Sequence, residues 1–112
     1  SSTFSIRLSL QSLKFRGPDI LLDQIQYFIA LKILWIGVGV NLVDLPEWLG
    51  NISSLQQLYL MGCRELVHLP TKETMRRLTQ LKTLIIHNCP KFEDNERTKI
   101  SHVPWVKIND PQ

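Results

Sequence analysis

Two cysteines and a nearby histidine are the residues of this chain whose types and spacing could support covalent chemistry. Cys89 follows His87 by two positions, and a thiol beside an imidazole is the pairing that activates a cysteine nucleophile. A strand would place both side chains on one face, because alternate strand residues point the same way. Cys63 and Cys89, however, share one position of a repeated pattern in which that position points inward. We therefore expect two buried, reduced structural thiols in neighbouring repeats, with a disulfide between them as the alternative.

The residues needed to bind a metal or a phosphate group are incomplete. His87 and the two cysteines supply at most three ligands, fewer than the four of a structural zinc site. Gly37 and Gly39 form a G-x-G without the rest of the dinucleotide-binding fingerprint, a spacing more typical of a turn. His68 and His102 lie at other positions of the repeat. We expect no catalytic residue, no metal and no cofactor, and therefore a protein that is not an enzyme.

The composition and the charge balance exclude several kinds of partner. The chain has 112 residues, 44% of them hydrophobic and 21% charged, with a formal net charge of +3. This composition is typical of a single globular domain. Binding to nucleic acid needs a clustered basic face, and the small excess here is dispersed along the sequence, so we expect no nucleic-acid partner. No apolar run approaches the roughly 18 residues of a membrane span, so we expect no membrane partner.

An internal repeat organises the chain. The spacing L-x-x-L-x-L, with Val, Ile or Phe at some positions, starts near residues 10, 31, 55, 81 and 103. The intervals of 21, 24, 26 and 22 residues are those of leucine-rich repeats, and Cys63 and Cys89 occupy the Asn/Cys position of that motif. We predict an α/β fold: a leucine-rich-repeat solenoid with a parallel sheet on its concave face and an irregular or short-helix convex side. Residues 1–112 would form one domain, part of a horseshoe, with four repeats and a terminal strand near 103–109.

The same pattern predicts the elements that position these residues. The last two apolar residues of each copy are two apart, which is the period of a strand, and each repeat can bury them only against its neighbours. Between the strands we predict a helix over 19–30, an irregular return with a single helical turn over 45–54, a short helix over 71–80 and a solvated loop over 93–99. We expect the first strand either at 4–8 or at 10–15.

The strand residues that point away from the core form the candidate binding surface. One slot recurs in successive copies, and in a parallel sheet its residues would stack about 4.8 Å apart. The candidate partner-binding residues on this concave face are Lys14, Arg16, Ile33, Trp35, Gln57, Tyr59, Thr83, Ile85, His87, Trp105 and Lys107. Solenoids usually bind with this face, and an apolar, aromatic patch with basic neighbours is typical of a protein interface. The alternative is that strand propensity alone favours Trp, Tyr and Ile here.

Two stretches resemble a known family. Residues 45–63, Leu-Pro-Glu-Trp-Leu-Gly-Asn-Ile-Ser-Ser-Leu-Gln-Gln-Leu-Tyr-Leu-Met-Gly-Cys, are similar to the late repeats of plant intracellular nucleotide-binding leucine-rich-repeat resistance proteins of the coiled-coil type. The ending resembles the C-terminal close of the same family, with Cys89-Pro90, a polar insert and a His-x-Pro strand from His102. The resemblance is strongest from 31 to 110.

This resemblance implies a cytoplasmic recognition module of plant innate immunity, at the far end of a longer receptor. Such repeats contact a pathogen effector or a guarded host protein, and they contribute to autoinhibition against the receptor's nucleotide-binding domain. One rival is an extracellular leucine-rich-repeat receptor. Such receptors have a nearly constant repeat of about 24 residues and favour Asn at the position where this chain has Cys. The glycosylation pattern Asn51-Ile52-Ser53 fits that rival. The second rival is a substrate-binding adaptor of a ligase complex.

Overall fold

Short strands and short helices alternate along the chain in the computed structural model, which describes residues 2–110. In chain order the elements are α1 (Ser2–Ser9), β1 (Ser12–Phe15), η1 (Asp19–Tyr27), β2 (Ile33–Ile36), η2 (Glu47–Asn51), β3 (Gln57–Met61), α2 (Lys72–Arg76), β4 (Thr83–His87), η3 (Asp94–Ile100) and β5 (Trp105–Ile108), where η marks a 3₁₀ helix. Within residues 2–110 no helix is long and apolar enough to cross a membrane.

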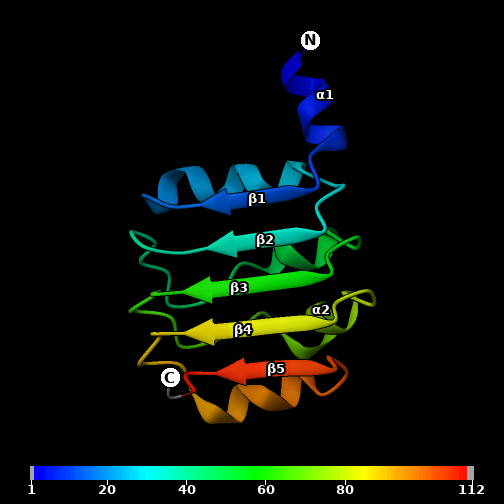
Figure 1. The fold of residues 1–112 in the computed structure, drawn as a ribbon. Coiled ribbons are helices and arrows are strands. Elements are labelled where there is room, and N and C mark those ends of the chain that lie inside the picture. Colours follow the sequence, from blue (N-terminus) through cyan, green and yellow to red (C-terminus); the bar gives the residue numbers. More distant parts are fainter. Residues whose placement is uncertain (1, 111–112) are drawn as a thin grey trace.

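All five strands lie side by side in one parallel sheet, in the order of the sequence (Figure 1). The pairing joins equivalent positions of the repeated pattern: Leu13 pairs with Leu34, Leu34 with Leu58, Leu58 with Leu84, and Leu84 with Val106. Each strand covers the L-x-L part of one copy. The predicted α/β fold with a parallel sheet is therefore confirmed.

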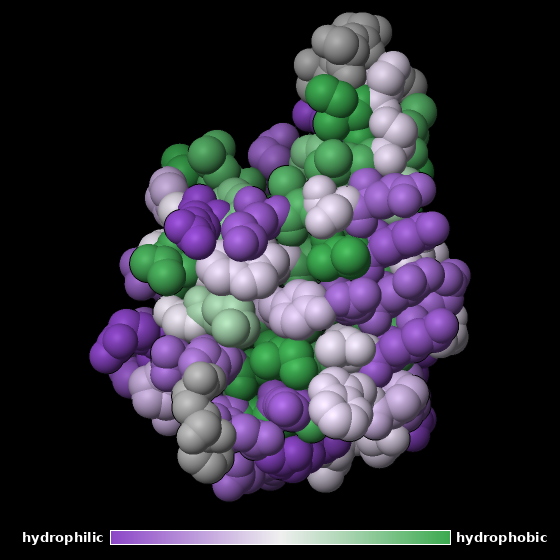
Figure 2. All heavy atoms as spheres, in the orientation of Figure 1, coloured by the Kyte–Doolittle hydropathy of each residue, from purple (hydrophilic) through white to green (hydrophobic). Residues whose placement is uncertain are grey.

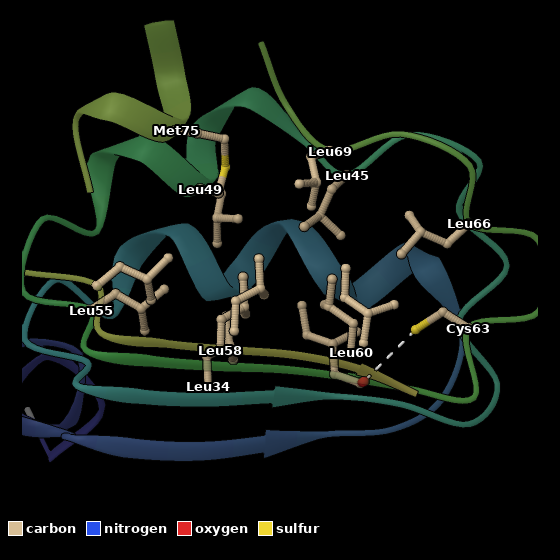
Figure 3. Close-up of a cluster of buried hydrophobic side chains, with 14 of the residues drawn as sticks. Leu34, Leu45, Leu49, Leu55, Leu58, Leu60, Cys63, Leu66, Leu69 and Met75 are labelled. Atoms are coloured by element: carbon tan, nitrogen blue, oxygen red, sulfur yellow. Dashed lines mark hydrogen bonds between the residues drawn. The ribbon is translucent and has the colours of Figure 1, made fainter. Parts of the chain in front are cut away.

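The core is a single apolar layer between the sheet and the segments that return from one strand to the next (Figure 3). The inward residues of the middle strands, among them Leu34, Leu58 and Leu84, are fully buried. Leu49 and Met75 of the return segments meet them from the other side. The helices cover only this face of the sheet (Figure 1), so the opposite face is left open.

Each return segment between two strands contains one short helix. The helix predicted over 19–30 is the 3₁₀ helix η1, the one over 71–80 is confined to α2, and the single turn predicted in 45–54 is η2. Thr71 caps α2 by accepting a hydrogen bond from the Thr74 amide at 3.3 Å. Thr74 and Thr71 also donate hydrogen bonds to the Glu47 carboxylate in η2, and these bonds connect the two return segments. The same hydrogen bonds lower the pKa of Glu47.

One sequence prediction was wrong, and one choice that the sequence left open is resolved. The segment 93–99 is not a solvated loop, because η3 spans most of it and the Glu96 side chain is buried there. Glu96 accepts a hydrogen bond from the Leu69 amide at 2.6 Å and pairs with Lys99 at 2.8 Å, and these partners offset the cost of burying a carboxylate. Of the two alternatives for the first strand, 10–15 is confirmed, because β1 spans Ser12–Phe15, whereas residues 4–8 lie within α1.

The burial of Leu58 gives a direct test of this packing. Leu58→Ala removes a fully buried side chain from the middle strand, and we expect the free energy of unfolding to fall by about 2–5 kcal/mol. Thr83→Ala on the open face is the control, with an expected loss under about 1 kcal/mol. Urea denaturation measures both. Equal losses for the two variants would contradict the assignment of inner and outer strand faces.

Candidate functional site

The sheet face opposite the core, called the open face below, carries every residue predicted for partner binding. Burial alternates along β2, β3 and β4, so that odd and even positions point to opposite sides. The residues on the open face are Ser12, Lys14, Arg16, Ile33, Trp35, Gly37, Gln57, Tyr59, Met61, Thr83, Ile85, His87, Trp105 and Lys107. The structure thus brings the predicted site residues together on one surface.

A central column crosses the open face perpendicular to the strands. Lys14 pairs with Trp35, Trp35 with Tyr59, Tyr59 with Ile85, and Ile85 with Lys107. Each step is one strand spacing, about 4.8 Å. Figure 2 looks onto this face and shows pale and green side chains across its middle, with purple, hydrophilic ones above and beside them. The middle of the column is therefore apolar or aromatic, and its two ends are cationic.

Trp35 is held in place by three neighbours on the open face. The Lys14 ammonium lies 4.9 Å and the Arg16 guanidinium 5.2 Å from the centre of the indole ring. The ring extends over Gly37, where a Cβ atom would lie 2.1 Å from the indole Cη2. Gly37 is therefore needed for space beneath the ring, a role that the turn interpretation of Gly37-Val38-Gly39 missed. The turn itself is made by Val38 and Gly39, with Gly39 at φ 96°.

Tyr59 and Trp105 also have partners on the open face. The Tyr59 hydroxyl donates a hydrogen bond of 2.6 Å to the Gln57 side-chain carbonyl. The Lys107 ammonium lies 5.5 Å from the centre of the Trp105 ring, and Trp105 is 57% exposed. Trp35 and Tyr59 are both half-buried. The Trp35, Tyr59 and Trp105 rings are thus each in contact with a neighbouring side chain, and each keeps part of its surface accessible.

The two cysteines, Cys63 and Cys89, are buried and free of a disulfide, as the sequence predicts. Cys63 Sγ lies 3.7 Å from the Ile36 carbonyl (dashed in Figure 3), and Cys89 Sγ lies 3.5 Å from the equivalent Leu60 carbonyl. The hydrogen bond with Cys89, together with burial, raises the pKa of the Cys63 thiol, and the same contact lowers the pKa of the Cys89 thiol. His87 lies on the open face and Cys89 points inward, so they do not form the catalytic pair considered above.

An open pocket of about 530 Å³ lies near the carboxyl ends of the last strands, lined by Arg64, Asn88, Pro90 and Asn109. The Asn109 side chain accepts from the Cys89 amide at 2.9 Å and donates to the Cys89 carbonyl at 2.8 Å. Its polar atoms therefore hold the end of β5 against the preceding turn. Sequence reasoning missed this contact. Among residues 2–110, no three His, Cys, Asp or Glu side chains are grouped as a metal ion would require.

His68 bridges three copies of the repeated pattern away from the open face. Its Nδ1 lies 2.7 Å from Asp44 and its Nε2 3.0 Å from Glu93. With a carboxylate at each ring nitrogen, both nitrogens must donate, which favours the imidazolium. Asp44 first, and then Glu93, raise the pKa of His68 above its usual value of 6.5.

Comparison of the chain with protein-family models, with curated proteins and with solved structures finds no match.

The position of the Trp35 ring can be tested through Gly37. Gly37→Ala places a methyl group where the ring now lies, so the indole must move and lose its contacts with Lys14 and Arg16. We expect the Trp35 indole NMR signal to shift. We also expect the free energy of unfolding to fall by about 0.5–1 kcal/mol for each lost cation–π contact. Val38→Ala, at an exposed neighbouring position, is the control. An unchanged Trp35 signal in Gly37→Ala would contradict this placement.

The His68 bridge predicts a pH dependence of stability. Its folded-state pKa lies above the unfolded value, so its stabilisation is complete below about pH 6.5 and is lost as pH rises through the raised pKa. His68→Gln should flatten this decrease, whereas His102→Gln, at an exposed position, should leave it intact. Urea denaturation from pH 5 to 9 measures the slope, and an unaltered slope in His68→Gln would count against the bridge.

Proposed function

We propose that this chain is a leucine-rich-repeat solenoid that binds another protein through its open face, as part of a plant innate immune receptor. The observation that carries the proposal is the central column: five equivalent positions of the repeated pattern align on neighbouring strands, from Lys14 to Lys107. Such a stack presents a continuous surface that no single repeat could form.

The contacts of the two cysteines support the repeat architecture. Each lies at the same position of the motif, and each thiol contacts the carbonyl of the equivalent residue in the preceding strand, Ile36 or Leu60. In both copies the thiol thus supplies a partner for a buried backbone carbonyl of the preceding copy. The spacing of Cys63 and Cys89 thus has a physical reason within a leucine-rich repeat.

The character of the open face supports protein recognition. Trp35 and Tyr59 are large, half-buried and held in position by neighbouring side chains. Aromatic residues held in this way are frequent hot spots of protein interfaces, because little side-chain entropy is lost when they are covered. A face chosen only for strand propensity would not need the glycine beneath Trp35.

The resemblance of residues 45–63 and of the chain ending to plant intracellular resistance proteins suggests the biological setting. In that setting the open face contacts a pathogen effector or a guarded host protein in the cytoplasm. A second contact, with the nucleotide-binding domain of the intact receptor, contributes to autoinhibition. The chain has no catalytic role in this proposal.

Site-specific photo-cross-linking tests the proposal. A photoreactive benzoyl-phenylalanine is placed at Tyr59, on the open face, or at Arg76, on α2 behind the sheet, and the protein is irradiated in plant leaf extract. We expect a discrete adduct from position 59 only, sensitive to protease and not to nuclease. Trp35→Ala should reduce that adduct by about tenfold or more, as for an interface hot spot. Its free energy of unfolding should fall by no more than the contribution of the lost cation–π contacts. Equal adducts from both positions would contradict recognition by the open face.

A further inference from the structure

We propose that the partner segment bound by the open face is acidic at both ends and apolar between them. This inference rests on the proposed function, because it specifies the chemistry of the protein that the open face binds. It follows from how charge is distributed along the central column.

The net charge of the whole chain is located on the open face. Lys14, Arg16 and Lys107 are three exposed cations there, and none of the outward strand residues from Ser12 to Lys107, all described by the structure, is Asp or Glu. The chain has 13 basic and 10 acidic residues, so the ten basic residues outside the open face equal the ten acidic ones. The basic excess, dispersed in the sequence, is therefore gathered on one side by the fold.

These cations lie at the two ends of the column and not along its length. Lys14 lies in β1 and Arg16 directly after it at one end, and Lys107 lies in β5 at the other. The positions between them are Trp35, Tyr59 and Ile85. A complementary ligand therefore needs negative charge at both ends and apolar side chains in the middle.

The length of the column fixes the length of that segment. Four strand spacings of about 4.8 Å place Lys14 and Lys107 roughly 19 Å apart. An extended peptide rises about 3.3 Å per residue, so its terminal carboxylates would be separated by about six residues. A segment of about eight residues, with acidic pairs at its ends, spans the open face.

A single-stranded nucleic acid fits the open face less well. Its phosphates recur at every nucleotide, so its binding sites carry cations along the whole path of the backbone. Across β2, β3 and β4 the open face has no Lys or Arg among its outward residues, all within the described part of the chain. Its aromatic residues therefore match apolar side chains better than stacked bases with their phosphates.

Fluorescence anisotropy with three labelled probes tests this inference on the full chain. The first is the peptide Glu-Asp-Leu-Tyr-Val-Leu-Asp-Glu, acidic at its ends. The second has the same composition with its acids in the centre, Leu-Tyr-Glu-Asp-Asp-Glu-Val-Leu. The third is an eight-nucleotide oligothymidine. We expect the end-acidic peptide to bind about tenfold tighter than the centre-acidic one, with an affinity that falls as salt is added.

Charge reversals locate the binding. Lys107→Glu and Lys14→Glu should each weaken the end-acidic peptide by about tenfold. Lys72→Glu makes the same change of net charge on exposed α2 and should stay within about twofold. If Lys107→Glu does not fold, as judged by circular dichroism, Lys107→Gln serves in its place with an expected loss of about threefold.

The remaining outcomes would overturn the inference. Equal affinity for the two peptides, or an equal loss in Lys72→Glu, would mean that net charge alone drives binding. Tighter binding of the oligothymidine would make the open face a nucleic-acid surface and would remove the proposed function as well. No peptide binding, with a protease-sensitive adduct still formed at Tyr59, would refute the acidic-ended segment and leave protein recognition standing.

Discussion

The inward side chains of each strand are buried against those of the next strand and under the return segments, and the other features of the protein depend on this mutual burial. Leu34, Leu58 and Leu84 form a continuous apolar layer in which no strand could bury its own leucines alone. The layer fixes the register, because a shift of one residue would turn every leucine outward. With the register fixed, equivalent positions of the pattern must align on the opposite face as well.

The open face is a consequence of that alignment. The return segments cover one side of the sheet only (Figure 1), so one residue in two along every strand is left to interact with its neighbours or with a partner. Trp35 shows both uses at once, because Lys14, Arg16 and Gly37 orient its ring while part of its surface stays accessible. The proposed protein-binding role and the proposed acidic-ended partner both follow from this arrangement of oriented aromatics between cationic ends.

The sequence alone predicted whatever depends on local periodicity: the strands from β1 to β5, their parallel order, the inward thiols and the residues of the open face. It did not predict side-chain contacts between positions that the repeated pattern does not relate. Glu96 was assigned to a solvated loop because its buried partner, the Leu69 amide, lies 27 residues earlier. The role of Gly37 depends on the orientation of the Trp35 ring, which no spacing encodes. The Asn109 contact with Cys89 and the His68 bridge were missed for the same reason, since each joins positions that the repeated pattern does not relate.

The register places Lys14, Trp35, Tyr59, Ile85 and Lys107 in one column on the open face. Side-chain nuclear Overhauser effects test this arrangement. We expect contacts between the Trp35 and Tyr59 rings and between the Tyr59 ring and the Ile85 methyl groups, with none from the Tyr59 ring to the Leu49 methyl groups in the core. Contacts from the Tyr59 ring to Leu49 would contradict it, because they would require the strand to expose its leucines and bury its aromatic residues.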